Sequence, residues 1–226
     1  MAGTSGRSES GGRGGGNAAA LTSWIDGWLP EEPILTAARQ RAAEVGVAAV
    51  DAASGNVLRL LAAVTGARAV VELGTGAGVS ALWLLRGMRA DGVLTSVDPE
   101  AEHQRLARQS LVEAGYGPGR VRLIAGRALE VLPRLSDGAY DLVFCDAARS
   151  ENTDYLAAAL RLLRTGGVVV FAGVLAGGRV ADPSARDTDT VSLRELTRLV
   201  REEARLVPAL VPVGAGLLAA VVVEPL

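Results

Sequence analysis

Short apolar segments alternate with helical patterns along most of the chain, and this alternation limits the possible folds more than any other feature. The helical patterns predict crossover connections between parallel strands, with helices on both faces of one sheet. Only a tight turn separates the last two strands, so they must pair antiparallel. The sequence therefore predicts an α/β fold with a seven-stranded, mostly parallel sheet and a C-terminal antiparallel hairpin. The expected strands are 69–73, 92–97, 120–124, 140–145, 167–172, 206–213 and 216–223, and the expected helices between them are 78–88, 100–114, 127–135, 151–163 and 188–204.

Two further helical stretches precede the first strand, one at about 34–43 and one that ends at Gly66, a residue suited to a helix C-terminus. With 226 residues, 49% of them hydrophobic, the chain fits one globular domain, expected at residues 21–226. Residues 21–66 are expected to form a helical lid on this domain. Residues 1–20, rich in Gly, Ser and Arg, are expected to be a disordered tail, and their lack of an apolar signal makes the cytoplasm the expected location.

Composition removes several functional classes. The chain has no Lys, which excludes a Walker A loop and a lysine Schiff base, and its net charge of −2 argues against nucleic acid as a partner. One Cys and one His cannot build a zinc cluster. The apolar C-terminal run is broken by Pro208, Pro212, Gly214 and Gly216, so two strands are expected there and no membrane span.

A glycine-rich loop, with Gly74, Gly76 and Gly78, follows the first strand and opens a helix. Glycines at this place let the backbone turn sharply and approach a ligand closely. A dinucleotide fingerprint would need its third glycine at position 79, which is Val, and Glu72 would repel a pyrophosphate. A nicotinamide oxidoreductase is therefore disfavoured.

Two acids flank this loop at the ends of neighbouring strands. Glu72 suits a cationic amino group, and Asp98 suits the two hydroxyls of a ribose. A nucleoside-linked amino acid with a sulfonium centre, S-adenosylmethionine, offers both groups. The alternative is an ordinary strand, turn and helix with solvated acids.

From about Pro33 onward the chain also resembles a known family, the class I S-adenosylmethionine-dependent O-methyltransferases of the cation-dependent catechol and caffeoyl-CoA type, in their bacterial branch. The resemblance implies a Rossmann-like class I methyltransferase fold, a small-molecule acceptor that can be aromatic, and a homodimer. The segments that carry it are "VELGTGAGVSALWLL", "GRALEVLPRL", "YDLVFCDA", "YLAAALRLLRTGGVVV", "GGRVADPSARD" and "VPVGAGLLAAV".

The same resemblance implies roles for individual residues. Glu72 would hold the methionine amino group, and Asp98 the ribose. Asp146, at the end of the fourth strand, would face the cofactor methyl group and the substrate. The remaining implied cofactor contacts are Gly74, Gly76 and Gly78 at the amino-acid end, Thr75 and Ser80 at the carboxylate, Ala128 at the adenine, and Val50 from the lid.

The chain departs from this family at its cation site. Relatives hold a divalent cation with the Asp that ends strand four and an Asp-Asn pair that ends strand five, and here the pair falls on Ala172 and Gly173. One carboxylate, Asp146, remains, so we expect no tightly bound metal. The family's catalytic lysine corresponds to Arg149, which stays protonated and can only orient or attract an anion in the substrate.

The remaining chemistry suits an acceptor that ionises easily, such as an acidic phenol or a carboxylate. Asp146 is the one well-placed base, although a passive contact with cofactor or substrate is an open alternative. Two functions follow: a metal-independent O-methyltransferase, or a cofactor-binding homologue that has lost catalysis.

Several other residues have plainer interpretations. Cys145 is expected to be a packed strand thiol and His103 a solvated residue on the flank of the sheet. Trp24 and Trp28, at helical spacing, are expected to fix the N-terminal helix to the domain or to form a lid over an aromatic acceptor. Arg179 and Arg186 lie in a long loop that shapes the acceptor pocket, contacts a second subunit, or is simply solvated.

Overall fold

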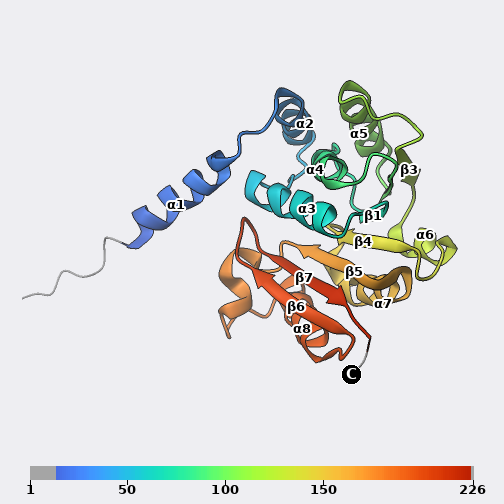
Figure 1. Cartoon of the computed structure of the whole chain (residues 1–226). Helices are drawn as coiled ribbons and strands as arrows, with labels where there is room; N and C mark the ends of the chain where they lie inside the picture. The colour runs from blue at the N-terminus through green and yellow to red at the C-terminus, as the bar shows by residue number, and fades with distance from the viewer. Residues whose placement is uncertain (1–13, 225–226) are drawn as a thin grey trace, which may run out of the picture.

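The computed structural model describes residues 14–224. Its centre is one seven-stranded sheet with the strand order β3-β2-β1-β4-β5-β7-β6 (Figure 1). The first five strands in the chain run parallel, whereas β7 pairs antiparallel with β5, and β6 antiparallel with β7. This confirms the predicted fold class and its terminal hairpin. The strands are β1 (Ala69–Leu73), β2 (Val93–Asp98), β3 (Val121–Ala125), β4 (Tyr140–Cys145), β5 (Leu163–Ala172), β6 (Leu206–Val211) and β7 (Leu217–Val222).

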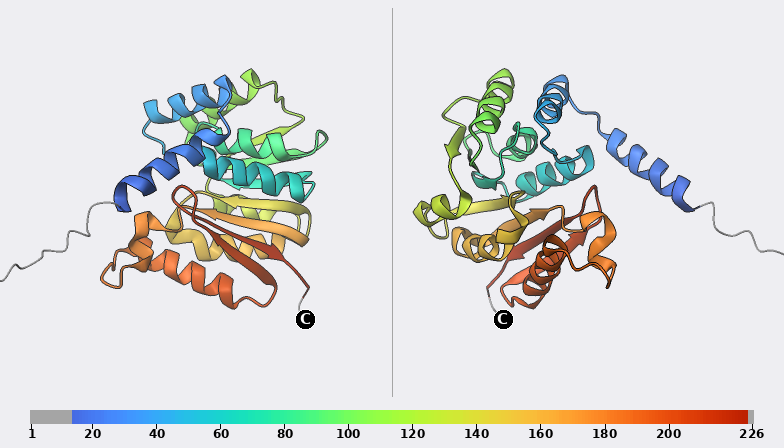
Figure 2. Two further views of the ribbon diagram at one scale, coloured as in Figure 1. Left: turned by 60° about the vertical axis from the view of Figure 1, so that its left-hand side comes forward. Right: turned by 180° about the vertical axis from the view of Figure 1, so that it is seen from behind.

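Helices cover both faces of this sheet (Figures 1 and 2). On one face α2, α3, α4 and α5 pack on strand residues such as Val70 and Phe144, and on the other α6, α7 and α8 pack on residues such as Val71 and Cys145. This alternation follows from the period of two in strands that are buried on both sides. The helices are α1 (Gly14–Trp28), α2 (Pro33–Glu44), α3 (Ala52–Val64), α4 (Val79–Gly87), α5 (Ala101–Glu113), α6 (Ala128–Val131), α7 (Asn152–Leu162) and α8 (Thr188–Glu202), with the 3-10 turns η1 (Leu132–Arg134), η2 (Arg149–Glu151) and η3 (Ala176–Ala181).

The N-terminal segment differs from expectation. Residues 14–20, expected in the disordered tail, belong to α1, since the run of alanines at 18–20 favours a helix. Residues 1–13 lie outside the described residues. Helix α1 leaves the body of the molecule (Figure 1), and Trp24 and Trp28 are 65% and 69% exposed. The expectation that these two side chains fix the helix to the domain was therefore wrong. Instead, a carboxylate oxygen of Asp26 accepts a hydrogen bond from the backbone N–H of Ala53, at 3.2 Å.

The C-terminal hairpin closes one side of the sheet. The outer strand, β6, has exposed side chains at Val207 and Leu210 and contains Pro208, which pairs with Ala220 of β7. Gly214 and Gly216 have positive φ angles in the turn between the two strands. Among residues 14–224, none of the helices has the length and apolarity needed to cross a membrane.

Candidate active site

The glycine loop joins β1 to α4 and adopts a conformation that only glycine tolerates easily. Gly74, Gly76 and Gly78 have φ angles of 93°, 49° and 88°. A Cβ on Gly74 would lie 2.1 Å from the backbone oxygen of Asp146, which shows how closely the loop approaches the end of β4. Gly78 packs against Ala107 of α5, where a Cβ would lie 3.2 Å from that residue's Cα.

Asp98, at the end of β2, holds this loop in place. Its Oδ2 accepts hydrogen bonds from the backbone N–H groups of Thr75 and Gly76, both at 3.0 Å. Its Oδ1 accepts one from the N–H of Glu100 at 2.9 Å. The carboxylate expected to bind ribose therefore also fixes the backbone of the cofactor loop.

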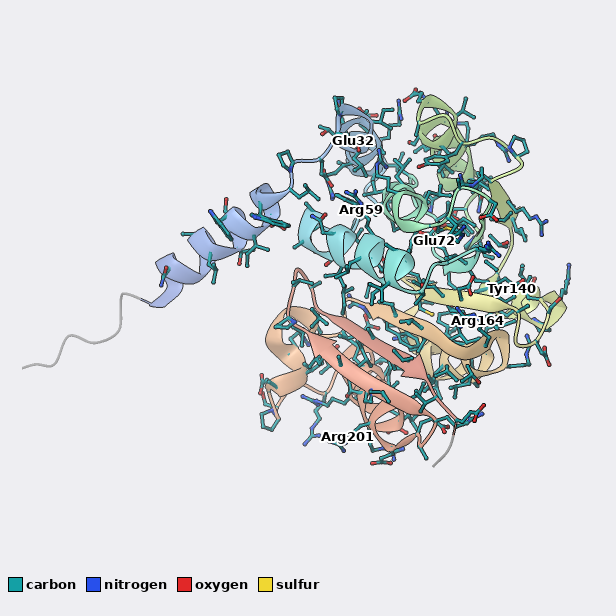
Figure 3. The ribbon with its side chains drawn as sticks, viewed as in Figure 1. Glu32, Arg59, Glu72, Tyr140, Arg164 and Arg201 are labelled. Carbon is teal, nitrogen blue, oxygen red and sulfur yellow. The ribbon has the colours of Figure 1, made fainter. Side chains whose placement is uncertain are left out.

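Glu72 is fully buried beneath the loop. In Figure 3 it lies inside the molecule, whereas Arg201 lies at the edge. One carboxyl oxygen, Oε2, accepts a hydrogen bond from the Ser96 hydroxyl at 2.5 Å, and the other, Oε1, has no hydrogen-bond partner among residues 14–224. Burial raises the pKa of Glu72 to about 7, with Asp146 and Asp98 adding to the rise and the hydroxyls of Ser80 and Ser96 opposing it. A buried acceptor without a donor costs free energy, so this oxygen is suited to a ligand cation.

A cavity of about 300 Å³ opens above the loop at the carboxyl ends of β1, β2 and β4. This is where open α/β sheets bind their ligands. The structure brings most of the predicted site residues to its wall: Val50, Gly74, Thr75, Gly76, Ser80, Asp98, Ala128 and Asp146. The predicted residues Glu72, Gly78 and Arg149 do not line it. Glu72 lies below the loop, Gly78 packs on α5, and Arg149 lies against Gly173.

His103 also lines this cavity, and its placement corrects the expectation of a solvated flank residue. Its Nδ1 lies 3.2 Å and 3.3 Å from the two carboxylate oxygens of Asp98. His103 is in the first turn of α5, directly after β2, and helices that follow strands begin over the strand ends. That position, five residues after Asp98, was the sequence signal that the expectation overlooked.

Asp146 ends β4, and its side chain is exposed to the cavity. The surrounding protein atoms raise its pKa, and the positive charge of Arg149 partly offsets the rise. Cys145, next to it, is buried in the core, as expected, and burial raises the pKa of its thiol well above the usual range.

The end of β5 offers no side-chain oxygen, because Ala172 and Gly173 occupy it. The guanidinium of Arg149 lies directly against Gly173, where a Cβ would be 3.1 Å from its Nη2. Within residues 14–224 no three His, Cys, Asp or Glu side chains come together as a metal site would require. One carboxylate next to a guanidinium does not fit a divalent cation.

The strand order, the glycine loop and the two acids at neighbouring strand ends define a class of protein, the Rossmann-like class I methyltransferases. Comparison with known proteins gives the family: the model of the O-methyltransferase family matches residues 30–222, and the chain belongs to that family.

Individual relatives agree with this assignment. The chain is 55% identical over 202 residues to "Probable O-methyltransferase" of Mycobacterium tuberculosis, covering 89% of this chain and 90% of that one. Among solved structures, it is similar to O-methyltransferase TomG of Streptomyces achromogenes in complex with S-adenosylmethionine (TM-score 0.82, 31% identity, 91% and 96% of the two chains covered). It is also similar to the O-methyltransferase of Bacillus cereus in complex with S-adenosylhomocysteine (TM-score 0.81, 29% identity, 90% and 97% covered). These findings confirm the expected S-adenosylmethionine-dependent O-methyltransferase and do not favour the inactive homologue.

Proposed function

We propose that this enzyme methylates an acidic oxygen of a small aromatic acceptor without a tightly bound divalent cation. The observation that carries the proposal is the composition of the strand ends beside the cavity. Asp146 contributes a carboxyl group, whereas Ala172 and Gly173 at the end of the neighbouring strand contribute no side-chain oxygen. An acceptor that ionises readily needs no metal to acidify it.

The cofactor contacts that we propose follow the geometry of the loop. The unpartnered Oε1 of Glu72 accepts from the methionine ammonium, and Asp98 accepts from the ribose hydroxyls. Thr75 and Ser80, with the glycine backbone, surround the carboxylate end. Ala128 borders the adenine, and Val50 closes the cavity from the lid side. The bound cofactor supplies a methyl group on a positively charged sulfur.

Asp146 is the proposed proton acceptor. Burial raises the pKa of Asp146, so it binds a proton more strongly than a solvated carboxylate does. The positive charge of Arg149 opposes this rise and favours the ionised form that can accept a proton. Its position at the mouth of the cavity lets it contact the acceptor oxygen. Arg149, whose guanidinium lies at the end of β5, is proposed to contact the substrate as well.

The test is turnover of labelled S-adenosylmethionine with a panel of phenols and carboxylic acids, in EDTA and in excess Mg²⁺. We expect equal rates in both conditions, and a fall in kcat of about 10²-fold or more in Asp146→Asn. S-adenosylhomocysteine should bind the variant as it binds the wild type. Turnover that requires Mg²⁺ would contradict the metal-independent reaction, and an undiminished kcat in Asp146→Asn would contradict the role of the base.

We further propose that the enzyme acts as a homodimer in the cytoplasm. Support for the dimer comes from α1, whose apolar side chains at positions 21, 24, 25 and 28 lie on one face and are all at least 37% exposed. A helix with an uncovered apolar stripe is suited to packing against a second protein surface.

A further inference from the structure

A second cavity, of about 440 Å³, lies beyond the end of β5, the strand that pairs with β4. Its walls come from η2, η3, the start of α8 and the β6–β7 turn, and they include Arg149, Arg179, Asp187, Asp189 and Thr190. Four of these five side chains are charged. This cavity therefore differs in character from the first, whose wall is mainly apolar.

Arg149 lines the second cavity at the end of β5. Its guanidinium lies against Gly173, whose φ of 69° and missing side chain leave room for it at the end of β5. Its backbone oxygen accepts a hydrogen bond from the Ser192 hydroxyl of α8 at 2.6 Å, which fixes the base of the side chain. Its charge offsets part of the rise that burial causes in the pKa of Asp146. A positive charge thus lies at the end of β5, next to the strand that Asp146 follows.

The two arginines of this cavity differ in how firmly they are held. Arg179 pairs with Asp187, and the same carboxylate also caps α8 through the N–H of Thr190. Arg149 pairs with Asp189 at 3.3 Å, and both side chains are about half exposed, at 41% and 54%. Exposed pairs of this kind contribute little to stability, so a ligand anion can replace Asp189. Arg149 is the cation that the cavity can offer to a ligand.

We propose that the second cavity is the acceptor site and that Arg149 takes the place of the divalent cation there. The site then selects acceptors with an ionised oxygen, either the reacting oxygen itself or a carboxylate next to it. This inference rests on the proposed methyl transfer at Asp146 and names the class of its substrate. A planar guanidinium binds a carboxylate through two parallel hydrogen bonds, which also orients the acceptor.

The experiment compares two probes of nearly the same shape, salicylate and the uncharged salicylamide. Each is titrated by ligand-observed NMR into the full chain saturated with S-adenosylhomocysteine, in EDTA. We expect salicylate to bind about tenfold more tightly than salicylamide, because a charge-assisted hydrogen bond replaces a neutral one. In Arg149→Ala the preference should disappear, and in Arg149→Lys it should fall to an intermediate value.

Asp189→Asn should change the affinity for salicylate in the opposite direction. Removing the competing carboxylate should tighten salicylate binding several-fold and leave salicylamide unchanged, which no general loss of structure would produce. Arg186→Ala is the matched control. Arg186 is exposed in the loop between η3 and α8 and does not line the cavity.

Three results would overturn the inference: equal binding of the two probes by the wild type, no binding of either, or a preference for salicylate that survives Arg149→Ala. Binding of S-adenosylhomocysteine, measured first on each variant, separates this failure from that of the proposed function. A wild type that does not bind S-adenosylhomocysteine contradicts the cofactor site, whereas a cofactor-bound protein without the salicylate preference contradicts only the role of Arg149.

Discussion

Glu72 shows how a single buried residue ties stability to function. Its pKa is about 7 in the folded chain against an ordinary value of 4.5, chiefly because burial disfavours the ionised form. The folded state therefore holds a proton that the unfolded state releases between these two values. The contribution of Glu72 to the free energy of unfolding therefore falls as the pH rises from about 4.5 to 7, by an amount on the order of 3 kcal/mol.

The substitution Glu72→Gln removes this cost. At about pH 8 we expect the cofactor-free variant to be more stable than the wild type by about 1–3 kcal/mol, and at about pH 5 the difference should largely vanish. Affinity for S-adenosylhomocysteine should fall at least about tenfold, since the ammonium loses its carboxylate. Urea denaturation at both pH values and calorimetric titration measure these effects. If Glu72→Gln is less stable than the wild type at both pH values, ionisation of the buried Glu72 is not what lowers the stability of the wild type at high pH.

His103 gives a second residue-scale prediction. Its Nδ1 lies 3.2 Å and 3.3 Å from the two carboxylate oxygens of Asp98 that we propose for the ribose hydroxyls. His103→Phe removes this competing contact, so S-adenosylhomocysteine should bind the variant about threefold more tightly. Calorimetric titration of both proteins measures the difference. Equal or weaker binding by the variant would rule out the competition.

The positions of residues at strand ends could be predicted from the sequence, whereas the surroundings of residues on helices could not. Asp98 and Asp146 could be placed because an apolar strand ends just before or at each of them, and the ends of parallel strands meet at one edge. His103, Trp24 and Trp28 were misplaced because sequence spacing gives the face of a helix that a residue occupies, but not what that face packs against. The roles assigned to single residues at the cofactor remain predictions.

At the scale of elements, the loop between β1 and α4 leaves no room for an added side chain at Gly74. In Gly74→Ala the added Cβ would lie 2.1 Å from the backbone oxygen of Asp146, so β4 or the loop has to move. We expect a loss of about 3 kcal/mol or more in the free energy of unfolding and no measurable binding of S-adenosylhomocysteine.

Gly66→Ala is the control for backbone strain. Gly66 also has a positive φ, of 58°, but no atom of the described residues lies within 4 Å of an added Cβ. This variant should lose only about 1 kcal/mol and keep its affinity for the ligand. Equal effects of the two substitutions, measured by denaturation and calorimetry, would show that φ strain, and not the contact with Asp146, makes the loop intolerant.

Most element types were predictable because periods of two and of 3.6 differ clearly along this chain. The exceptions lie where local geometry interrupts a pattern. Pro133 converts the second half of the expected helix 127–135 into the 3-10 turn η1. β5 begins at Leu163, ahead of the expected 167, since α7 passes directly into it.

At the scale of the whole molecule, the apolar face of the arm formed by α1 is left uncovered by the part of the chain that the structure describes. Leu21, Trp24 and Trp28 are 57–69% exposed, and Leu60 and Val64 of α3 are 59% and 75% exposed. A second copy of the chain offers apolar surface of the same kind to both. We therefore expect the purified protein to have twice the chain mass of 23.2 kDa.

Replacing both Trp24 and Trp28 with Gln should shift the protein to a monomer, as measured by light scattering on a sizing column. The control is Val112→Gln, since Val112 is also exposed, at 63%, but lies on α5. It should leave the mass unchanged. A wild type that is monomeric at micromolar concentration would end the dimer proposal.

One of the two borders of the sheet limits how copies can associate. β6 is the last strand on that side, and Pro208 within it has no N–H with which to bind a further strand. Strand-by-strand addition at this border, a route to fibres, is interrupted at Pro208. The proposed pairing through the helical arms would therefore leave the apolar side chains of β6 at the surface without extending the sheet from this border.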